Sequence, residues 1–377
     1  MEVTVAPLEE DGTEALYVAW RDLRFAKGRF ALMGTVIVLI TALVGLLSGL
    51  TAGLGQRNVS AITSLPADRI AFAAPPGGQG LSYSDSAVTE GQWRCWHRAA
   101  GVSGAEPLGI TVTRATTADR STGVGVFGVR SGAPLAPEGG RLGDRTAVLS
   151  VPAADALGLT PGDRFSLAGR LLTVAAVRGD AYFSHSPVIW TDLRVWRRTA
   201  APTGDGEPPF ATVIALNTTS RAGIPAADRA AGTETVTKED SLSAIGSYPS
   251  ENGSLQLMRG FLFAISALVV GAFFTVWTVQ RSGDIAVLKA LGAPTAALLR
   301  DALGQAAVLL TGGAAVGTAI AAAIGAGVSG STVPFVLDPA TALVPAAVTI
   351  LLGSAGAALS VRRITSVDPL TALGSVR

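Results

Sequence analysis

Residues 30–56 read FALMGTVIVLITALVGLLSGLTAGLGQ and contain no ionisable side chain. A helix rises about 1.5 Å per residue, so about 20 residues cross the hydrocarbon core of a bilayer. A cleaved signal peptide has an apolar region of only about 7–15 residues. This stretch is longer, and it follows a basic segment with four Lys or Arg residues at positions 21–29. The pattern therefore predicts a transmembrane helix.

Working outward, three further stretches without ionisable side chains lie near the C-terminus, at 260–280, 302–337 and 339–361. Each is long enough to span a bilayer. A long polar segment separates the first span from these three. The sequence therefore predicts a membrane protein with four transmembrane α-helices in a 1 + 3 arrangement, at 30–55, 258–280, 302–326 and 340–361.

The overall composition excludes two other classes of protein. Charged residues make up 15% of the 377-residue chain and apolar residues 49%, whereas an ordinary globular chain has about 25% charged residues. A disordered chain needs few apolar residues and a high net charge. A nucleic-acid partner is not expected, because the formal net charge is only +1 and such proteins carry a basic footprint.

The distribution of Lys and Arg predicts the orientation in the bilayer. Basic residues lie before the first span, in the segment 281–301 and in the tail 362–377, and none lies in 327–339. We therefore expect a multi-pass plasma-membrane protein with both termini and 281–301 in the cytoplasm. The segment 327–339 is then a short external loop. Ahead of the first span, 1–14 is an acidic tail, and 15–29 has the pattern of an amphipathic helix lying in the membrane interface. The alternative for 15–29 is a helical extension of the first span.

The segment 56–257 is expected to form an extracytoplasmic domain inserted between the first and second spans. It carries 18 basic and 18 acidic residues, and the chain has a single cysteine, Cys95, so no intrachain disulfide is possible. Alternating and β-branched runs predict strands, and Gly-Asp and Gly-Arg pairs predict turns between them. Helical patterns occur as well, so we expect an α+β fold. The strand-like runs are 69–72, 110–113, 124–129 and 171–177, and the helical ones are 86–98, 152–157 and 192–198.

Common catalytic and metal-binding patterns are missing from the sequence. With two histidines and one cysteine in the chain, a His/Cys zinc site is not expected. No lysine follows a glycine, which excludes the G-x-x-x-x-G-K phosphate loop. A G-x-G-x-x-G match at 123–128 lies inside a strand-like run, whereas a dinucleotide site needs a strand followed by a helix. We predict no enzyme activity, no metal and no intrinsic cofactor.

Gly45, Gly49 and Gly53 form a stripe of small residues on the first span. Such spacing lets helix backbones approach closely. The stripe is a candidate contact between two copies of the chain, and the alternative is packing inside one chain.

The segment 281–292, RSGDIAVLKALG, is too polar for lipid, yet Ile285, Leu288 and Leu291 fall on one face of a helix. Gly292 and the following Pro294 then end that helix. A short amphipathic helix between two spans is suited to docking into a groove on a cytoplasmic partner. An unoccupied surface connector is the alternative, but it would expose three ordered aliphatic side chains.

This segment resembles the signature of the FtsX-like, MacB-type ABC permease family. The matching residues are Arg281, Asp284 and Ile285, and then Lys289 to Ala293, with Asp284 where Glu is usual. The segments 19–23 and 362–373 and the 1 + 3 layout with a large external domain are similar too. The resemblance implies a homodimer that works with two copies of a separate cytoplasmic ATPase, which binds ATP and Mg²⁺. It assigns ATPase coupling to Arg281, Asp284, Ile285, Leu288, Lys289, Leu291 and Gly292.

Residues 179–190 are similar to the DevC and HrtB-type (haem exporter) branch of that family. This resemblance implies efflux of a lipophilic substrate, and haem is the best single guess. Tyr182 and His185 are candidate haem ligands, because both residue types serve as axial ligands of haem iron. The alternative is that both side chains only pack a loop. The alternative function is that of an FtsX-like transducer, which transports nothing and regulates an external wall hydrolase.

Overall fold

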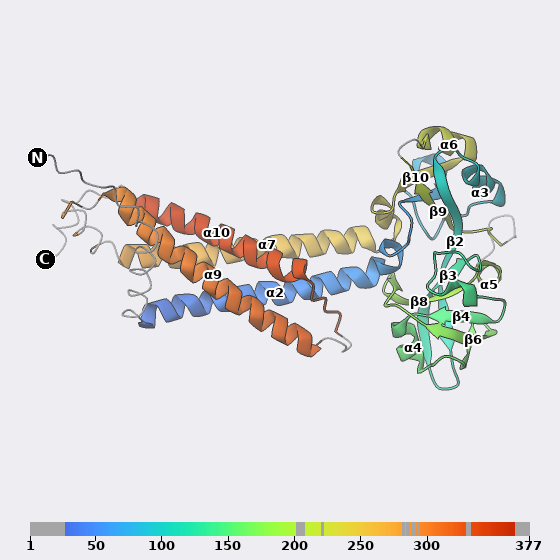
Figure 1. Ribbon diagram of the computed structural model, residues 1–377, viewed down its shortest axis with the longest axis horizontal. Coiled ribbons are helices and arrows are strands. Elements are labelled where there is room, and N and C mark those ends of the chain that lie inside the picture. Colours follow the sequence, from blue (N-terminus) through green and yellow to red (C-terminus); the bar gives the residue numbers. More distant parts are fainter. Residues whose placement is uncertain are drawn as a thin grey trace, which may run out of the picture. The chain divides into compact units, whose positions relative to one another are not determined.

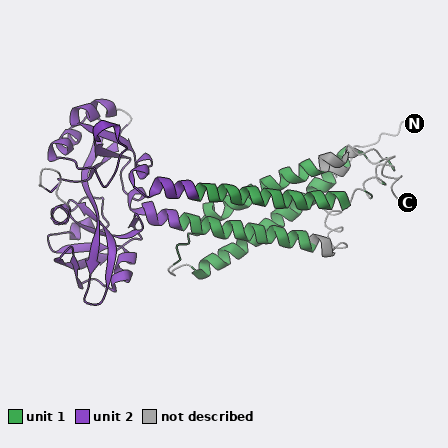
Figure 2. Ribbon diagram, turned by 180° about the vertical axis from the view of Figure 1, so that it is seen from behind, with its two compact units in different colours: residues 1–53, 255–377 green, residues 54–254 purple. Residues whose placement is uncertain are grey.

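The computed structural model describes residues 27–200, 208–219, 222–280, 294–328 and 333–365, with residues 283, 287, 291 and 292. The chain divides into two compact units, shown in Figure 2: residues 1–53 with 255–377, and residues 54–254. The predicted amphipathic helix at 15–29 falls almost wholly outside the described residues.

Four long helices carry the apolar sequence, and all four are long and apolar enough to cross a membrane. The predicted 1 + 3 set of membrane helices is therefore confirmed. All four helices extend beyond the predicted spans. The first and second extend furthest, because each continues into polar residues at the end that joins the inserted domain. The helices are α2 (Lys27–Thr63), α7 (Tyr248–Gln280), α9 (Thr295–Val328) and α10 (Pro339–Thr365) (Figure 1).

The helices of the membrane unit pack through an apolar cluster in which Phe274 of α7 and Leu310 of α9 are almost fully buried. Gly353 of α10 lets the Leu310 side chain approach, because a Cβ there would meet Leu310 carbons. Thr275 Oγ1 of α7 and Ser360 Oγ of α10 are also hydrogen-bonded, at 2.9 Å. Without water in the bilayer core, polar groups need such internal partners.

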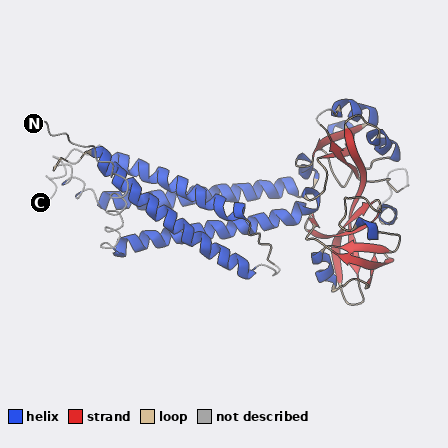
Figure 3. Cartoon of the chain, viewed as in Figure 1, coloured by secondary structure: helices blue, strands red, loops and turns tan. Residues whose placement is uncertain are grey.

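The unit 54–254 is built on one ten-stranded sheet in the order β10-β1-β9-β2-β3-β8-β4-β6-β5, with β7 paired to β8 (Figures 1 and 3). The 15-residue strand β2 pairs with β9 through its first half and with β3 through its second half. Strand β2 also pairs with β5, so that β2, β3, β8, β4, β6 and β5 form a closed ring of paired strands. The strands are β1 (Arg69–Ala73), β2 (Val102–Thr116), β3 (Ser121–Val129), β4 (Thr146–Leu149), β5 (Arg164–Leu167), β6 (Arg170–Val177), β7 (Tyr182–Phe183), β8 (Ser186–Asp192), β9 (Val213–Thr218) and β10 (Thr233–Thr237).

Short helices, drawn in blue in Figure 3, complete this unit beside the red strands. The polar residue before α3, Thr89, accepts a hydrogen bond from the Gln92 N–H, and the Gln92 side chain accepts one from the Thr89 N–H. This reciprocal pair satisfies two of the free amides at a helix start. The predicted α+β class is confirmed. The helices are α3 (Glu90–His97), α4 (Val151–Leu157), α5 (Leu193–Arg197) and α6 (Ile224–Ala231), with single turns η1 (Pro76–Gly78), η2 (Gly139–Arg141) and η3 (Asp240–Ala244).

The G-x-G-x-x-G match at 123–128 lies within strand β3, as predicted from its strand-like context. Its last glycine, Gly128, faces the indole ring of Trp196, and so does Gly109 on β2. A Cβ at either position would overlap that ring. These glycines therefore serve the packing of a fully buried tryptophan.

The C-terminal end of α2 belongs to the core of the unit 54–254. Ile62 and Leu65 are buried in one apolar cluster with Phe72 of β1 and Phe127 of β3. This burial fixes the last two turns of α2 against the sheet and sets the position of the polar residues just before them.

Candidate functional site

The turn between β7 and β8 is held against α2 by backbone hydrogen bonds. The Ser184 N–H donates to the Asn58 carbonyl and the His185 N–H to the Arg57 carbonyl, both at 2.9 Å. Ser184 and His185 have φ of 48° and 62°, a left-handed conformation that costs about 1–2 kcal/mol for a residue with a Cβ. The two hydrogen bonds to the helix offset this cost.

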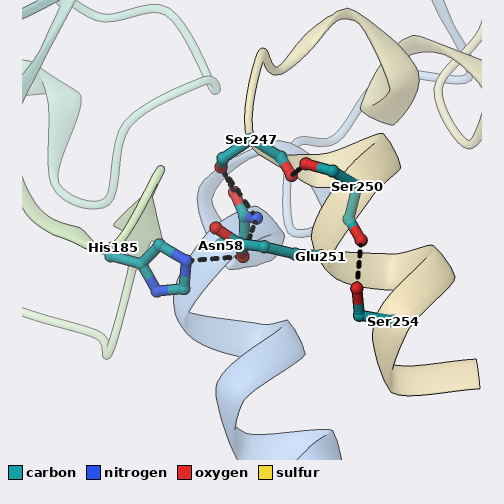
Figure 4. A network of polar contacts seen from close by, with 6 residues as sticks. All are labelled: Asn58, His185, Ser247, Ser250, Glu251 and Ser254. Carbon is teal, nitrogen blue, oxygen red and sulfur yellow. Dashed lines mark hydrogen bonds and ion pairs between the residues drawn. The ribbon is translucent and has the colours of Figure 1, made fainter. Parts of the chain in front are cut away.

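A polar network, shown in Figure 4, joins the same turn to α7. The His185 Nε2 atom lies 2.7 Å from Glu251 Oε2, and the Asn58 Nδ2 donates to that oxygen at 2.8 Å. Asn58 is only 1% exposed, and its Nδ2 also lies 3.1 Å from Ser247 Oγ. Side chains of α2, of α7 and of the β7–β8 turn therefore meet at one carboxylate. We call this set, Asn58, His185, Ser247 and Glu251, the strap.

The network continues along α7 through hydroxyl groups. Ser250 Oγ donates to the Ser247 carbonyl at 3.1 Å, and Ser254 Oγ donates to the Ser250 carbonyl at 2.9 Å (Figure 4). Each hydroxyl is thereby satisfied by a backbone carbonyl three or four residues earlier in the chain, a common arrangement for serine in a helix.

Tyr182, the second haem candidate, lies next to His185 but outside the strap. Its backbone N–H donates to Ser60 Oγ of α2 at 2.8 Å, and the Arg57 guanidinium lies 5.4 Å from the centre of its ring. Burial raises the pKa of the Tyr182 phenol, and the nearby Arg57 charge opposes that shift. The phenol is thus held in its neutral form.

The structure thus brings the two sequence candidates together on one hairpin, with both engaged in contacts to helices. Iron could bind His185 through Nε2 only after the contact with Glu251 had been broken. Sequence reasoning missed Asn58 and Glu251. The only feature of the sequence that could have pointed to them is that each is a polar residue beside the end of a long apolar stretch.

The predicted coupling segment, residues 281–292, is described only in part. Arg281, Asp284, Ile285, Leu288 and Lys289 lie outside the described residues. Leu291 closes a helical turn, with its N–H 3.0 Å from the Val287 carbonyl, and its side chain is 79% exposed. Gly292 follows with φ of 90°, the left-handed conformation that ends a helix.

The glycine stripe of α2 faces residues of its own chain. A Cβ on Gly45 would lie 3.0 Å from the Ala321 Cβ of α9, and one on Gly49 would overlap the Phe335 ring. A Cβ on Gly53 would overlap the Pro334 carbonyl. The Val336 N–H donates to the Gly49 carbonyl at 3.1 Å. These contacts correspond to packing inside one chain, which the sequence offered as the alternative to a contact between two copies.

Within the described ranges, no group of three or more His, Cys, Asp or Glu side chains could hold a metal ion.

Two family profiles match consecutive parts of the chain. The MacB-like periplasmic core domain matches residues 30–234, which is more than half of the chain. The FtsX-like permease C-terminal domain matches residues 257–369.

Comparison with curated proteins gives relatives along the whole chain. A protein of Staphylococcus epidermidis named as the hemin transport system permease protein HrtB is 24% identical over 368 residues, which cover 95% of this chain and 99% of that protein. An uncharacterized ABC transporter permease of Mycobacterium tuberculosis is 25% identical over 373 residues, with the same coverage. Among solved structures, the periplasmic region of MacB from Actinobacillus actinomycetemcomitans has a TM-score of 0.33 at 11% identity, covering 48% of this chain and 94% of that one.

Proposed function

Because this chain belongs to the FtsX- and MacB-type family of ABC transporter permeases, we propose that it exports a lipophilic molecule from the membrane, driven by a separate cytoplasmic ATPase. It is the non-catalytic subunit, so ATP and Mg²⁺ bind to the partner chain. One observation carries the proposal. Both α2 and α7 continue without a break from apolar sequence into the strap.

In the proposed mechanism, closure of the ATPase moves the coupling segment 281–292. An exposed Leu291 offers the apolar contact that such a partner would cover. The motion travels along α7 and α2 to the strap. From there it reaches β8, because His185 directly precedes that strand, which pairs with both β3 and β4.

The assembly we propose is a homodimer with two ATPase copies. Both termini and the coupling segment face the cytoplasm, in agreement with the Lys and Arg distribution. The three stripe glycines of α2 already pack against their own chain. The dimer contact therefore uses another helix surface.

Haem is the cargo we propose first, since the chain is similar over its full length to a protein named as a hemin transport permease. Tyr182 and His185 are the proposed ligands. His185 is 40% exposed at its side chain, so the imidazole is within reach of a bound molecule once Glu251 releases it.

Replacing Leu291 or Leu288 by Glu tests the docking role. The full chain is co-expressed and reconstituted with the cytoplasmic ATPase that copurifies with it. A charge on the docking face should abolish the stimulation of ATP hydrolysis while leaving membrane insertion intact. The matched control is Leu171→Glu in the outer domain, where a 61% exposed leucine should tolerate the charge. Normal stimulation in both coupling variants would rule out this docking surface.

Two measurements test haem as the cargo. A strain without this gene should be more sensitive to added haem than the wild type, and equal sensitivity would remove haem from the proposal. Titrating the purified protein with haem should shift the Soret band, and His185→Ala should reduce that shift. An exporter of another substrate, or an FtsX-like transducer, would show neither effect.

A further inference from the structure

A groove of about 540 Å³ runs beside the C-terminal end of α2, entirely within the unit 54–254. This volume is in the range of small-molecule sites. Tyr182 and His185 do not line it, so it is separate from the proposed haem ligands. It is lined by Gln56, Ser60, Ala61, Thr63, Ser64, Pro66, Pro134, Leu135, Pro137, Gly179, Asp180, Ala181 and Trp190.

The two walls of the groove differ in character. One wall is α2, where Gln56, Ser60 and Ser64 lie on successive turns of the same face. Ser60 Oγ accepts from the Tyr182 N–H and Ser64 Oγ donates to the Ala61 carbonyl, so the polar character of this wall rests mainly on the Gln56 amide. The other wall is apolar and includes Leu135 and Trp190, both buried. A ligand that fills the groove therefore needs a polar side and an apolar side.

Among the described residues that line the groove, Asp180 is the only ionisable one. It is exposed, and no ion pair among the described residues joins it to a basic group. The neighbouring Arg178 is already paired, at 2.6 Å from Glu138. The groove therefore favours a cation over an anion.

Trp190 supplies a second and independent feature. Its side chain is 5% exposed, and no hydrogen bond within the described part of the chain uses its indole N–H. By contrast, the indoles of Trp93 and Trp96 donate at 2.9 Å to the Ala105 carbonyl and to Thr233 Oγ1. The Trp190 N–H is not one of the fully buried unpaired donors of the described chain, so it reaches the surface of the groove. There an acceptor atom on a ligand can replace water as its partner.

We propose that this groove binds an amphiphilic organic cation. The cationic nitrogen lies against Asp180, an acceptor atom receives the Trp190 N–H, and the apolar body packs on Leu135 and the neighbouring prolines. Haem carries two carboxylates, which Asp180 would repel. The groove is thus a second site with its own class of ligand, and it goes beyond the export function proposed above.

Binding of rhodamine 6G to the purified full-length chain tests this proposal, measured by fluorescence anisotropy without ATPase or ATP. This dye is an apolar cation with an ester carbonyl, whereas fluorescein is a dianion of similar size. We expect rhodamine 6G to bind and fluorescein to bind at least tenfold more weakly. Asp180→Asn should weaken rhodamine 6G binding by about fivefold, the effect of one exposed charge pair.

The matched control is Asp119→Asn, which removes an exposed acidic charge outside the groove and should change the affinity less than twofold. Trp190→Phe keeps an aromatic ring and removes the N–H, and should also weaken binding. Equal affinities for the two dyes, or equal effects of Asp180→Asn and Asp119→Asn, would overturn the proposal. Because Asp180 is exposed, its variant remains informative even if Trp190→Phe does not fold. Loss of ATPase coupling with intact dye binding would refute the export function alone.

Discussion

Replacing Asn58 by Ala is the sharpest test of the strap. The Asn58 Nδ2 donates to the Glu251 carboxylate at 2.8 Å and lies 3.1 Å from Ser247 Oγ. A hydrogen bond to a charged group contributes about 1.5–3 kcal/mol. The Glu251 side chain is 40% exposed and can regain water, so the lower value of about 1.5 kcal/mol applies. This corresponds to about a tenfold increase in the open population of the strap.

The assay is native-state hydrogen exchange of the full chain, followed by mass spectrometry over residues 182–187. The Ser184 and His185 amides in this peptide donate to carbonyls of α2, so they exchange when the strap opens. We expect about tenfold faster exchange in Asn58→Ala. The control is Asn217→Ala, whose amide donates to the neutral Pro66 carbonyl at 3.0 Å and which should change exchange of the peptide less than twofold. Equal rates in the two variants would refute the assignment of Asn58 to the strap.

Two further predictions concern packing and pH. Gly53→Ala places a Cβ on the Pro334 carbonyl and should destabilise the chain by about 1–3 kcal/mol. The control is Gly34→Ala, which has nothing within 4 Å of its Cβ and should be neutral or slightly stabilising. Thermal unfolding in detergent compares the two variants, and equal unfolding midpoints would contradict the prediction. Burial raises the pKa of Tyr83 above its ordinary value of 10.0, so the unfolded chain loses this proton first and the free energy of unfolding should fall as the pH rises above 10. Tyr83→Phe should make the free energy of unfolding fall less steeply between pH 10 and 11. The same pH dependence in the variant and the wild type would contradict the buried position of Tyr83.

The membrane helices could be predicted because lipid forbids charge over a continuous stretch. Residues 30–56 show this directly. Several strands were predictable because the alternation of apolar and polar residues is also a property of a short continuous stretch. The run at 171–177, for example, alternates in burial along β6.

The strap could not be predicted, because it joins residues far apart in the chain. Asn58 and Glu251 are separated by 193 positions, and only the fold of the unit 54–254 brings them together. The glycine stripe shows the other limit. Spacing indicated that something packs closely on Gly49, but not that the occupant is Phe335 of the same chain.

Native mass spectrometry of the complex extracted in mild detergent tests the central claim most directly. If the chain is a permease subunit driven by a separate ATPase, the particle should contain two copies of this chain and two copies of an ATPase. ATP hydrolysis should depend on both components. A particle that contains this chain alone, under conditions in which the ATPase is expressed, would contradict the account.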